Sequence, residues 1–309
     1  MHLKPMPLAI ACKSRLLTLT ALIGLVLPGV AAMAAANTGN TTADASTPTP
    51  AADKGFSYFL GLARQELRYS ETGSRYPFKT TASAGNPLLV TGALYAVNDQ
   101  WLLSLDNETT FYAGRGNETW RATSATFEGQ PLTSPVLQTN RFSLWQSHTQ
   151  LLGHYRVKDQ WFVLAGGALR TQSFKRFSFV AGPDDATRLS NSSTVEESAS
   201  EILFKLGAAL ESEQVRGQAA HYGLRATLGL PLWRRLNNTD NPTLRFDAAK
   251  GYDLSLEGRY SWAMSRNIHL GSWGQWAVAH RGNQILGAAE MPRSRLDSLS
   301  YGLELLWKL

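Results

Sequence analysis

Cysteine is nearly absent from the sequence: Cys12 is the only one among 309 residues. It lies in an N-terminal segment that we expect to be removed, so the mature chain would have no disulfide, no thiolate metal site and no cysteine nucleophile. The sequence also lacks a His-Glu-x-x-His motif, an EF-hand loop and a glycine-rich phosphate loop. These absences lead us to predict no metal and no other cofactor.

The first 36 residues resemble a secretory signal peptide. Lys4, Lys13 and Arg15 form a basic region without acidic residues, and a short apolar stretch over residues 16–26 precedes a run of small residues. We therefore expect residues 1–36 to be cleaved during export. A permanent membrane anchor is the alternative, but the apolar stretch is shorter than the roughly 20 residues that a spanning helix needs.

The chain that remains after export is only mildly basic. Residues 37–54 have no large apolar side chain and should form a flexible tail, which leaves residues 55–309 as the folded part. The formal net charge is +6, and removal of the three cations of the signal peptide lowers it to +3. Because the basic character comes partly from the export signal, we predict no nucleic-acid partner.

Long apolar runs are missing after residue 36, and the pattern found instead has a period of two. In the stretch 251–262, Tyr252 and Leu254 alternate with Asp253 and Ser255, and the alternation continues to Tyr260. Such a pattern predicts β-strands with one apolar face. A soluble β-sandwich, with its apolar faces turned to a core, can carry the same pattern.

The order of connection lengths favours a membrane barrel over a sandwich. We predict ten strands, near residues 55–70, 86–97, 101–113, 140–157, 161–174, 199–213, 218–233, 247–263, 267–281 and 294–309. Long connections at 71–85, 114–139, 175–198, 234–246 and 282–293 alternate with short ones at 98–100, 158–160, 214–217 and 265–266. Long outer loops alternating with tight periplasmic turns are typical of outer-membrane barrels. The expected fold class is therefore all-β, a transmembrane antiparallel up-and-down β-barrel of about ten strands.

Aromatic residues gather beside the short connections. The segment from Tyr95 to Trp101 has a near copy from Tyr155 to Trp161, each with a polar turn between its two rings. The residues that we expect at the membrane–water interface are Tyr95, Trp101, Tyr155, Trp161, Tyr260, Trp262 and Trp307. Rings with an apolar body and a polar tip suit that interface, although hairpins of a soluble sheet carry them too.

The end of the chain resembles the closing strand of bacterial outer-membrane β-barrel proteins. Tyr301, Leu303, Leu305, Trp307 and Leu309 alternate up to the last residue. In that class an aromatic residue is usual at the final position, where this chain has Leu309. The resemblance implies export to the outer membrane of a Gram-negative cell envelope, with the barrel assembly machinery as a partner during biogenesis. It rests on pattern alone, without a motif of a specific family.

The residues that alternate with the apolar set should face the barrel lumen. This set comprises Asp106, Glu108, His154, Arg156, Arg170, Lys205, Glu211, His221, Arg225, Asp253, Glu257, Arg259 and Glu304. A ten-stranded barrel is narrow, and an isolated charge inside it would lose its hydration without compensation. We therefore expect these charges to pair with one another and to fill most of the lumen.

The motifs of barrel enzymes are not recognisable in the sequence. Outer-membrane proteases of the omptin kind, similar in strand number and length, use paired acids with an Asp–His pair, yet the Asp184-Asp185 pair lies in a Pro/Gly loop that favours a turn. A lipid hydrolase would need a serine, a histidine and an acid brought together. The candidate bases are His148, His154, His221, His269 and His280. A sequence does not show which serine lies beside them.

The outer loops form the remaining surface. The segment 114–139 carries Trp120, Phe127 and Leu137, and the segment 175–198 carries Lys175 and Arg176. Basic residues mixed with rings can contact lipopolysaccharide phosphates or a surface partner, although polar hairpin extensions look the same. We therefore expect a structural or surface-interaction barrel without catalytic activity, in contact with outer-membrane lipid and lipopolysaccharide. A narrow channel for small solutes and a hydrolase of lipid or peptide are the alternatives.

Overall fold

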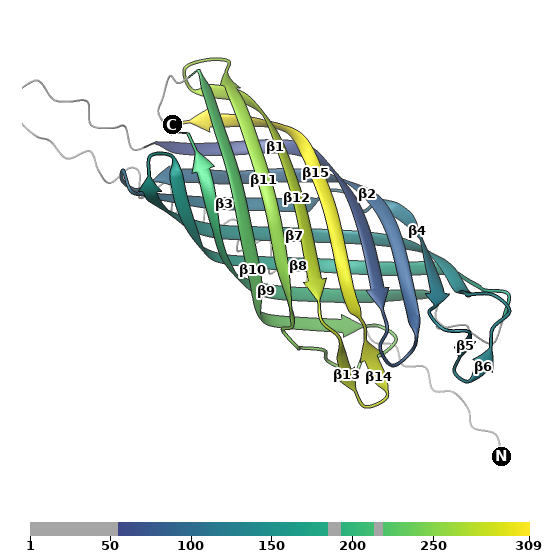
Figure 1. Cartoon of the computed structure of the whole chain (residues 1–309). Coiled ribbons are helices and arrows are strands. Elements are labelled where there is room, and N and C mark those ends of the chain that lie inside the picture. Colours follow the sequence, from purple (N-terminus) through teal and green to yellow (C-terminus); the bar gives the residue numbers. More distant parts are fainter. Residues whose placement is uncertain (1–54, 185–192, 213–218) are drawn as a thin grey trace, which may run out of the picture. The chain divides into compact units, whose positions relative to one another are not determined.

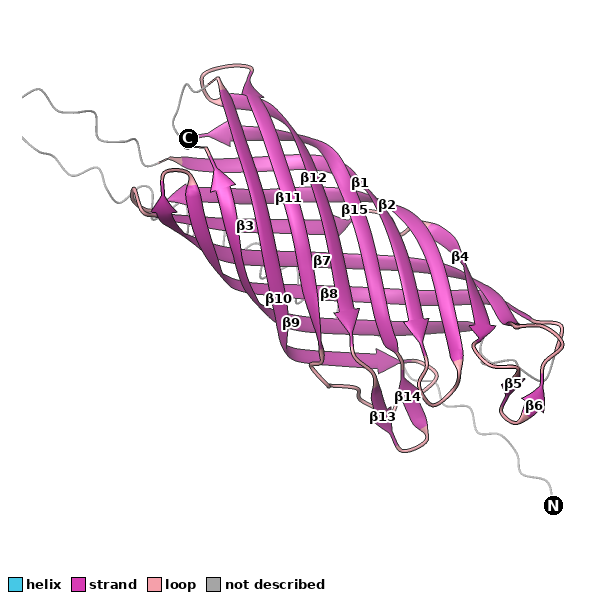
Figure 2. Ribbon diagram, viewed as in Figure 1, coloured by secondary structure: helices cyan, strands magenta, loops and turns pink. Residues whose placement is uncertain are grey.

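The computed structural model describes residues 55–184, 193–212 and 219–309, which form a closed antiparallel β-barrel (Figure 1, Figure 2). The signal peptide expected at 1–36 and the tail expected at 37–54 lie outside the described residues. Within the described part, no helix is long and apolar enough to cross a membrane. The predicted fold class, an all-β up-and-down barrel, is confirmed.

Long strands occupy ten positions around the ring. They are β1 (Phe56–Thr72), β2 (Phe78–Ala96), β3 (Trp101–Thr110) continued by β4 (Arg115–Ala122), β7 (Val136–Lys158), β8 (Trp161–Ala181), β9 (Thr194–Glu211), β10 (Ala220–Asn238), β11 (Gly251–Ala263), β12 (Ile268–Arg281) and β15 (Arg293–Lys308). Two small hairpins lie in connections: β5 (Thr126–Phe127) with β6 (Gln130–Pro131), and β13 (Gln284–Leu286) with β14 (Ala289–Met291). Because β1 pairs with both β2 and β15, the sheet has no free edge at that seam.

The strands run further at the long-loop end than the sequence predicted. The long loop predicted at 71–85 is wrong, because β1 and β2 remain paired up to Thr72 and Lys79 and leave only residues 73–77 between them. The predicted loop 114–139 contains β4, the β5–β6 hairpin and the start of β7, and the predicted loop 175–198 contains the ends of β8 and β9. These strand ends are polar on their outward face, so the apolar alternation used to find strands stops before the strands do.

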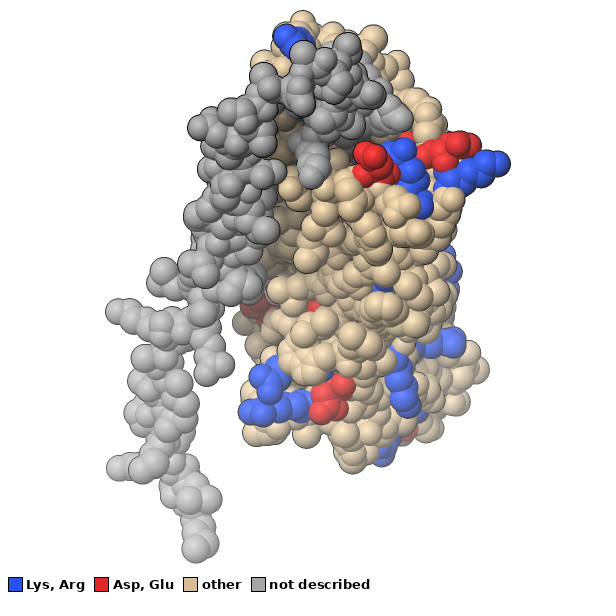
Figure 3. Space-filling view, turned by 90° about the vertical axis from the view of Figure 1, so that its left-hand side faces the viewer, with Lys and Arg blue, Asp and Glu red and all other residues tan. Residues whose placement is uncertain are grey.

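An apolar band surrounds the barrel near the short turns. On β15 the outward residues from Trp307 to Leu299 are aromatic or aliphatic, and Asp297 and Arg295 follow. A tilted strand crosses the hydrocarbon layer in about 9–11 residues, which is close to the length of this band. On the face shown in Figure 3 the charged residues lie mostly toward the two ends, with a largely uncharged zone between. The rest of each strand therefore extends past the band on the long-loop side.

Apolar side chains fill part of the lumen. The ring centroids of Tyr69 and Phe142 are 5.5 Å apart, and those of Tyr69 and Phe174 are 4.7 Å apart. Phe59 and Trp273 belong to a second buried cluster. Offset and tilted ring pairs of this kind add to the stabilisation that burial provides. The charged residues of the lumen are grouped around these clusters.

Candidate functional site

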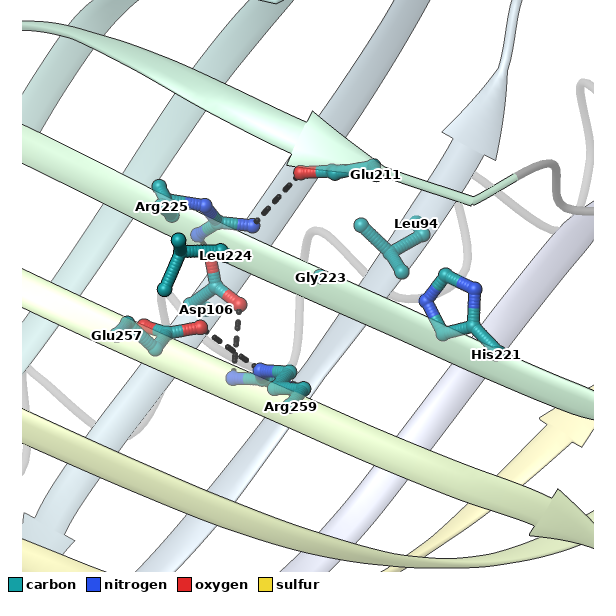
Figure 4. Close-up of a pocket in the computed structure, with 9 residues that line it drawn as sticks. All are labelled: Leu94, Asp106, Glu211, His221, Gly223, Leu224, Arg225, Glu257 and Arg259. Carbon is teal, nitrogen blue, oxygen red and sulfur yellow. Dashed lines mark hydrogen bonds and ion pairs between the residues drawn. The ribbon is translucent and has the colours of Figure 1, made fainter. Parts of the chain in front are cut away.

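The lumen near the short turns holds a group of charged residues, here called the turn-end network (Figure 4). Arg225 of β10 donates a hydrogen bond to Asp106 of β3 over 2.8 Å and lies 3.7 Å from Glu211 of β9. Arg259 of β11 lies 3.4 Å from Asp106 and contacts two further carboxylates at 2.8 and 3.1 Å. The members of the network are Asp106, Glu211, Arg225, Glu257, Arg259 and Glu304. The strands thus bring together predicted lumen residues that are far apart in the sequence.

A second group, the middle network, crosses the lumen. Arg170 of β8 donates to Asp253 of β11 over 2.7 Å and to Glu201 of β9 over 2.5 Å. Asp253 also accepts a hydrogen bond from Lys205, and Glu201 accepts one from Arg234 of β10 at 2.5 Å. Because β9 and β10 separate β8 from β11 in the sheet, the contact between Arg170 and Asp253 spans the inside of the barrel.

A third group, the loop-end network, was missed by the sequence analysis. Arg176 contacts Glu118 at 2.8 Å and Glu71 at 3.0 Å, and Arg281 contacts Glu71 at 3.4 Å and Glu197 at 2.6 Å. The prediction that Arg176 lies in an outer loop is wrong, since it is buried inside β8. The signal that could have found these residues is their position two or four places from other inward residues. The predicted strands ended too early to include Glu71, Glu118, Arg176 and Glu197, whereas Arg281 was the last residue of the predicted strand 267–281 and was not counted among the lumen residues.

Two predicted lumen residues face inward without an ion pair among the described residues. The guanidinium of Arg156 lies over the ring of Phe162, 5.3 Å from its centroid. Glu108 accepts a hydrogen bond from the side-chain amide of Gln275 at 2.8 Å. The expectation that every lumen charge meets an opposite charge is therefore wrong at these two positions, where a ring and an amide are the partners instead.

Small cavities lie beside the charged residues of the lumen. The cavity lined by Asp106, Arg225 and Arg259 has a volume of about 20 Å³. A cavity beside Glu108 and His148 has a volume of about 40 Å³, as does one near the short turns. A water molecule needs at least roughly 10–15 Å³ by this measure, so each cavity has room for one or a few waters.

His154 of β7 lies between a serine and a carboxylate. Its Nε2 atom is 2.9 Å from the hydroxyl oxygen of Ser104 of β3, and its Nδ1 atom is 3.1 Å from a carboxylate oxygen of Glu211. This is the order of nucleophile, base and orienting acid found in serine hydrolases. Both Ser104 and His154 are fully buried. The sequence could not reveal this set because its members come from three different strands.

Two other histidines also contact serines near the short turns. His221 lies 2.6 Å from Ser212, and His269 lies 3.4 Å from Ser261. Each serine and its histidine lie on opposite sides of one short connection, so mirrored spacing about a turn is a signal that could have found them. Buried polar groups in a lumen need such partners, which accounts for these pairs without catalysis.

The aromatic residues predicted for the membrane interface lie on the outward face beside the short turns. Trp101 and Tyr155 are cross-strand partners with ring centroids 5.0 Å apart. Trp307 stacks on Tyr58, a residue that the sequence analysis did not include, at 5.9 Å. The others are exposed or half-buried on the same face: Tyr95, Trp161, Tyr260 and Trp262. Outside this group, His280 stacks outward on Tyr252 at 5.3 Å.

The long loops are joined to one another by hydrogen bonds. Glu290 of β14 accepts bonds from the backbone N–H of Ser74 at 2.7 Å and of Arg75 at 2.9 Å, and from the Ser74 hydroxyl at 2.6 Å. Partial burial raises the pKa of Glu290, but the hydrogen bonds from Ser74 and its neighbours outweigh that effect, and the pKa is lowered. The loop between β12 and β15 is thereby held against the loop between β1 and β2.

A second carboxylate joins another pair of loops. Asp184 accepts a hydrogen bond from the Thr133 hydroxyl at 2.6 Å and from the Thr133 backbone N–H at 3.0 Å. The hydroxyl bond lowers the pKa of Asp184. Asp185, its partner in the predicted Asp pair, lies outside the described residues. Among the residues that the structure does describe, no group of three or more His, Cys, Asp or Glu side chains is placed to hold a metal ion.

The fold can be compared with solved structures. No protein-family model and no curated protein sequence matches the chain. The outer membrane protease OmpT from Escherichia coli is similar in structure, with a TM-score of 0.59 and 11% identity over 86% of this chain and 99% of that chain. The outer membrane protein OprG from Pseudomonas aeruginosa, with a TM-score of 0.33 and 10% identity over 83% and 96% of the two chains, is too distant to carry an argument. The chain therefore has the fold of bacterial outer-membrane β-barrel proteins, and no family model assigns it to a specific family.

Proposed function

We propose that the protein is a closed barrel of the outer membrane, which does not conduct solutes and acts through its outward surface. The single observation that carries this proposal is the middle network, in which Arg170 of β8 reaches Asp253 of β11 at 2.7 Å across the lumen. Glu201, Arg234 and Lys205 contact the same two residues or each other's partners. The cavities beside the lumen charges have volumes of about 20–40 Å³. We infer from these contacts and cavity volumes that a solute larger than water does not pass between these side chains.

Planar-bilayer recording tests this proposal. The full chain, refolded and inserted at single-molecule density, should give no stepwise conductance at any voltage. A loss of heat-modifiable migration would show that the chain had not folded, so migration is measured on the same sample. Regular conductance steps from folded protein would overturn the proposal and favour the narrow channel.

A second candidate function, a serine hydrolase, rests on the contact of His154 with Ser104 and Glu211. In such an enzyme the Ser104 oxygen would form a bond to the acyl carbon of an ester while its proton moves to His154 Nε2. His154 would then protonate the leaving alcohol as the ester bond breaks. In the second half of the reaction, water would give a proton to His154 and attack the acyl carbon, which frees the acid and returns the proton to Ser104. The carboxylate of Glu211 would stabilise the charged imidazole. The full burial of Ser104 makes this the weaker candidate, because a substrate must first reach it.

A fluorophosphonate probe separates the two functions. If Ser104 is a nucleophile, the probe should label the folded protein, and Ser104→Ala or His154→Ala should abolish the labelling. Ser261→Ala is the matched control, because Ser261 also contacts a histidine but has no carboxylate beyond it in the structure described here. Absence of labelling in the wild-type barrel would remove this candidate.

A further inference from the structure

Three exposed cations lie close together on the outward face of neighbouring strands. Arg115 of β4 and Lys175 of β8 are both cross-strand partners of Ser143 on β7, and Arg141 lies two residues along β7 from Ser143. Strands are spaced about 4.8 Å apart and residues about 3.3 Å along a strand, so the cation-bearing positions lie within about 7–10 Å of one another. We call Arg115, Arg141 and Lys175 the outer cationic surface.

None of these three cations forms an ion pair with a carboxylate in the described structure. Strands β2, β4, β7 and β8 carry a single acidic residue, Glu118, and it points into the lumen. Arg141 donates to the side-chain oxygen of Asn117 at 3.1 Å, and Arg115 lies over the ring of Phe177. Glu196 of β9, opposite Lys175, accepts a hydrogen bond from Ser173 at 2.7 Å and forms no ion pair with Lys175.

Exposed arginines on another part of the barrel differ in this respect. Arg64 of β1 lies 2.5 Å from Glu66, and Arg295 of β15 lies 2.7 Å from Asp297. Each of these cations therefore has its own carboxylate two residues away on the same strand. The absence of an ion pair at Arg115, Arg141 and Lys175 is therefore a local property and not a general feature of the outward face.

A break in the third strand places aromatic rings just below the cations. Between β3 and β4 the chain leaves the sheet, and Phe111 and Tyr112 are 79% and 61% exposed. Asn86 of β2 supports the break: it accepts a hydrogen bond from Gly114 N–H at 2.8 Å and donates one to the Leu144 carbonyl at 3.0 Å. Asn86 is fully buried, and its two hydrogen bonds fix the backbone of the segment that carries Phe111 and Tyr112.

The outer cationic surface lies past the apolar band, on its long-loop side. On β8 the outward residues up to Leu169 are aromatic or aliphatic except for Gly167, and Thr171 and Ser173 then precede Lys175. Outward Trp145 lies opposite Ser173, one residue pair below the cations. Past the apolar band, rings precede the cations, and this order matches an amphiphile that has acyl chains below and anionic groups above.

We propose that the outer cationic surface binds the phosphate groups of a phosphorylated glycolipid in the outer leaflet, with Phe111 and Tyr112 against its apolar part. The guanidinium groups of Arg115 and Arg141 present several N–H donors to phosphate oxygens, and Lys175 adds a third charge. The inference rests on the proposed function in one respect, the outward direction of the long-loop end.

Binding of bisphosphorylated lipid A to the full chain in detergent micelles tests the inference. The double variant Arg115→Gln with Lys175→Gln should raise the dissociation constant by about tenfold or more, since each cation contributes to attraction of an anionic headgroup. Arg64→Gln with Arg295→Gln is the matched control and should leave the constant nearly unchanged. Dephosphorylated lipid A should bind wild type and the Arg115/Lys175 variant equally.

Two results would overturn the inference. One is equal binding of bisphosphorylated lipid A by the wild type and the Arg115/Lys175 variant, with heat-modifiable migration showing that both are folded. The other is an equal loss in the Arg64/Arg295 control, which would indicate attraction by net charge alone. Conductance in bilayers together with intact lipid A binding would refute the closed barrel but not the lipid site. Loss of the difference in lipid A binding without conductance would refute the lipid site but not the closed barrel.

Discussion

Arg170 and Asp253 meet at 2.7 Å although two strands separate them in the sheet. The contact lies inside the barrel, and Asp253 also accepts a hydrogen bond from Lys205, so one carboxylate serves two cations. A buried pair of this kind adds little net stability over an apolar substitute, but removal of one partner leaves an uncompensated charge. The contacts of the middle network therefore depend on one another.

The first prediction concerns that shared carboxylate. Asp253→Asn should lower the free energy of unfolding by about 3–5 kcal/mol, because Lys205 and Arg170 then lose their common counter-charge. Denaturant unfolding of the refolded barrel in lipid measures the effect. Asp297→Asn, which removes the half-buried partner of the exposed Arg295, should cost about 0–1 kcal/mol. A similar small loss for both variants would show that the middle network does not stabilise the barrel.

The second prediction concerns the direction of the barrel in the membrane. The mature chain is expected to lack cysteine, so single cysteines can report exposure. Gln130→Cys, on the β5–β6 hairpin, should react with an impermeant maleimide on intact cells. Lys158→Cys, beside a short turn, should react only after the outer membrane is opened. The reverse labelling pattern would place the long loops in the periplasm and contradict the assignment.

The third prediction is a pH dependence of the contact between loops. The pKa of Glu290 is lowered from its ordinary value of 4.5, so the stabilisation it provides is complete above that value and is lost as the pH falls through the lowered pKa. At pH 7, Glu290→Gln should speed hydrogen exchange of the Ser74 and Arg75 amides by about fivefold. Below the lowered pKa the wild type and the variant should exchange at similar rates.

The control for that experiment is Glu128→Gln. Glu128 lies in the turn of the β5–β6 hairpin with a positive φ of 49°, and it is exposed. Its substitution should leave the Ser74 and Arg75 amides unchanged at every pH. An exchange ratio between wild type and Glu290→Gln that stays constant from neutral to acid pH would contradict a role for the ionised carboxylate.

The fourth prediction separates the two faces of β12. Trp276 is 46% exposed on the outward face, and Trp273, three residues earlier, is 4% exposed and points into the lumen. Lipids with brominated acyl chains quench only rings that they can touch. Trp276→Phe should therefore remove part of the quenchable fluorescence, whereas Trp273→Phe should remove unquenched fluorescence. Equal quenching of both rings would show that lipid reaches the interior.

The sequence predicted the membrane part of the barrel well and the rest poorly, for one reason. Near the short turns each strand alternates between lipid and lumen, as in the residues from Trp307 back to Leu299, and a period of two identifies it. Past the membrane, water replaces lipid on the outward face, so polar residues occupy both sides of the strand. The ends of β1, β2, β8 and β9 therefore lack the apolar alternation that identifies a strand, and the inward residues Arg176 and Glu71 on these ends were not predicted.

What the sequence determined by itself was the strand type, the order of connections and the identity of most inward charges, because alternation is a local property of the chain. Only the tertiary structure decided which of these charges meet, since contacts such as those of Arg225 with Asp106 and of His154 with Ser104 depend on closure and register of the ring. The break that exposes Phe111 and Tyr112 was likewise invisible, because Asn86, which supports it, lies on another strand. Distances across a barrel are set by pairing around the whole ring and cannot be read from spacing along the chain.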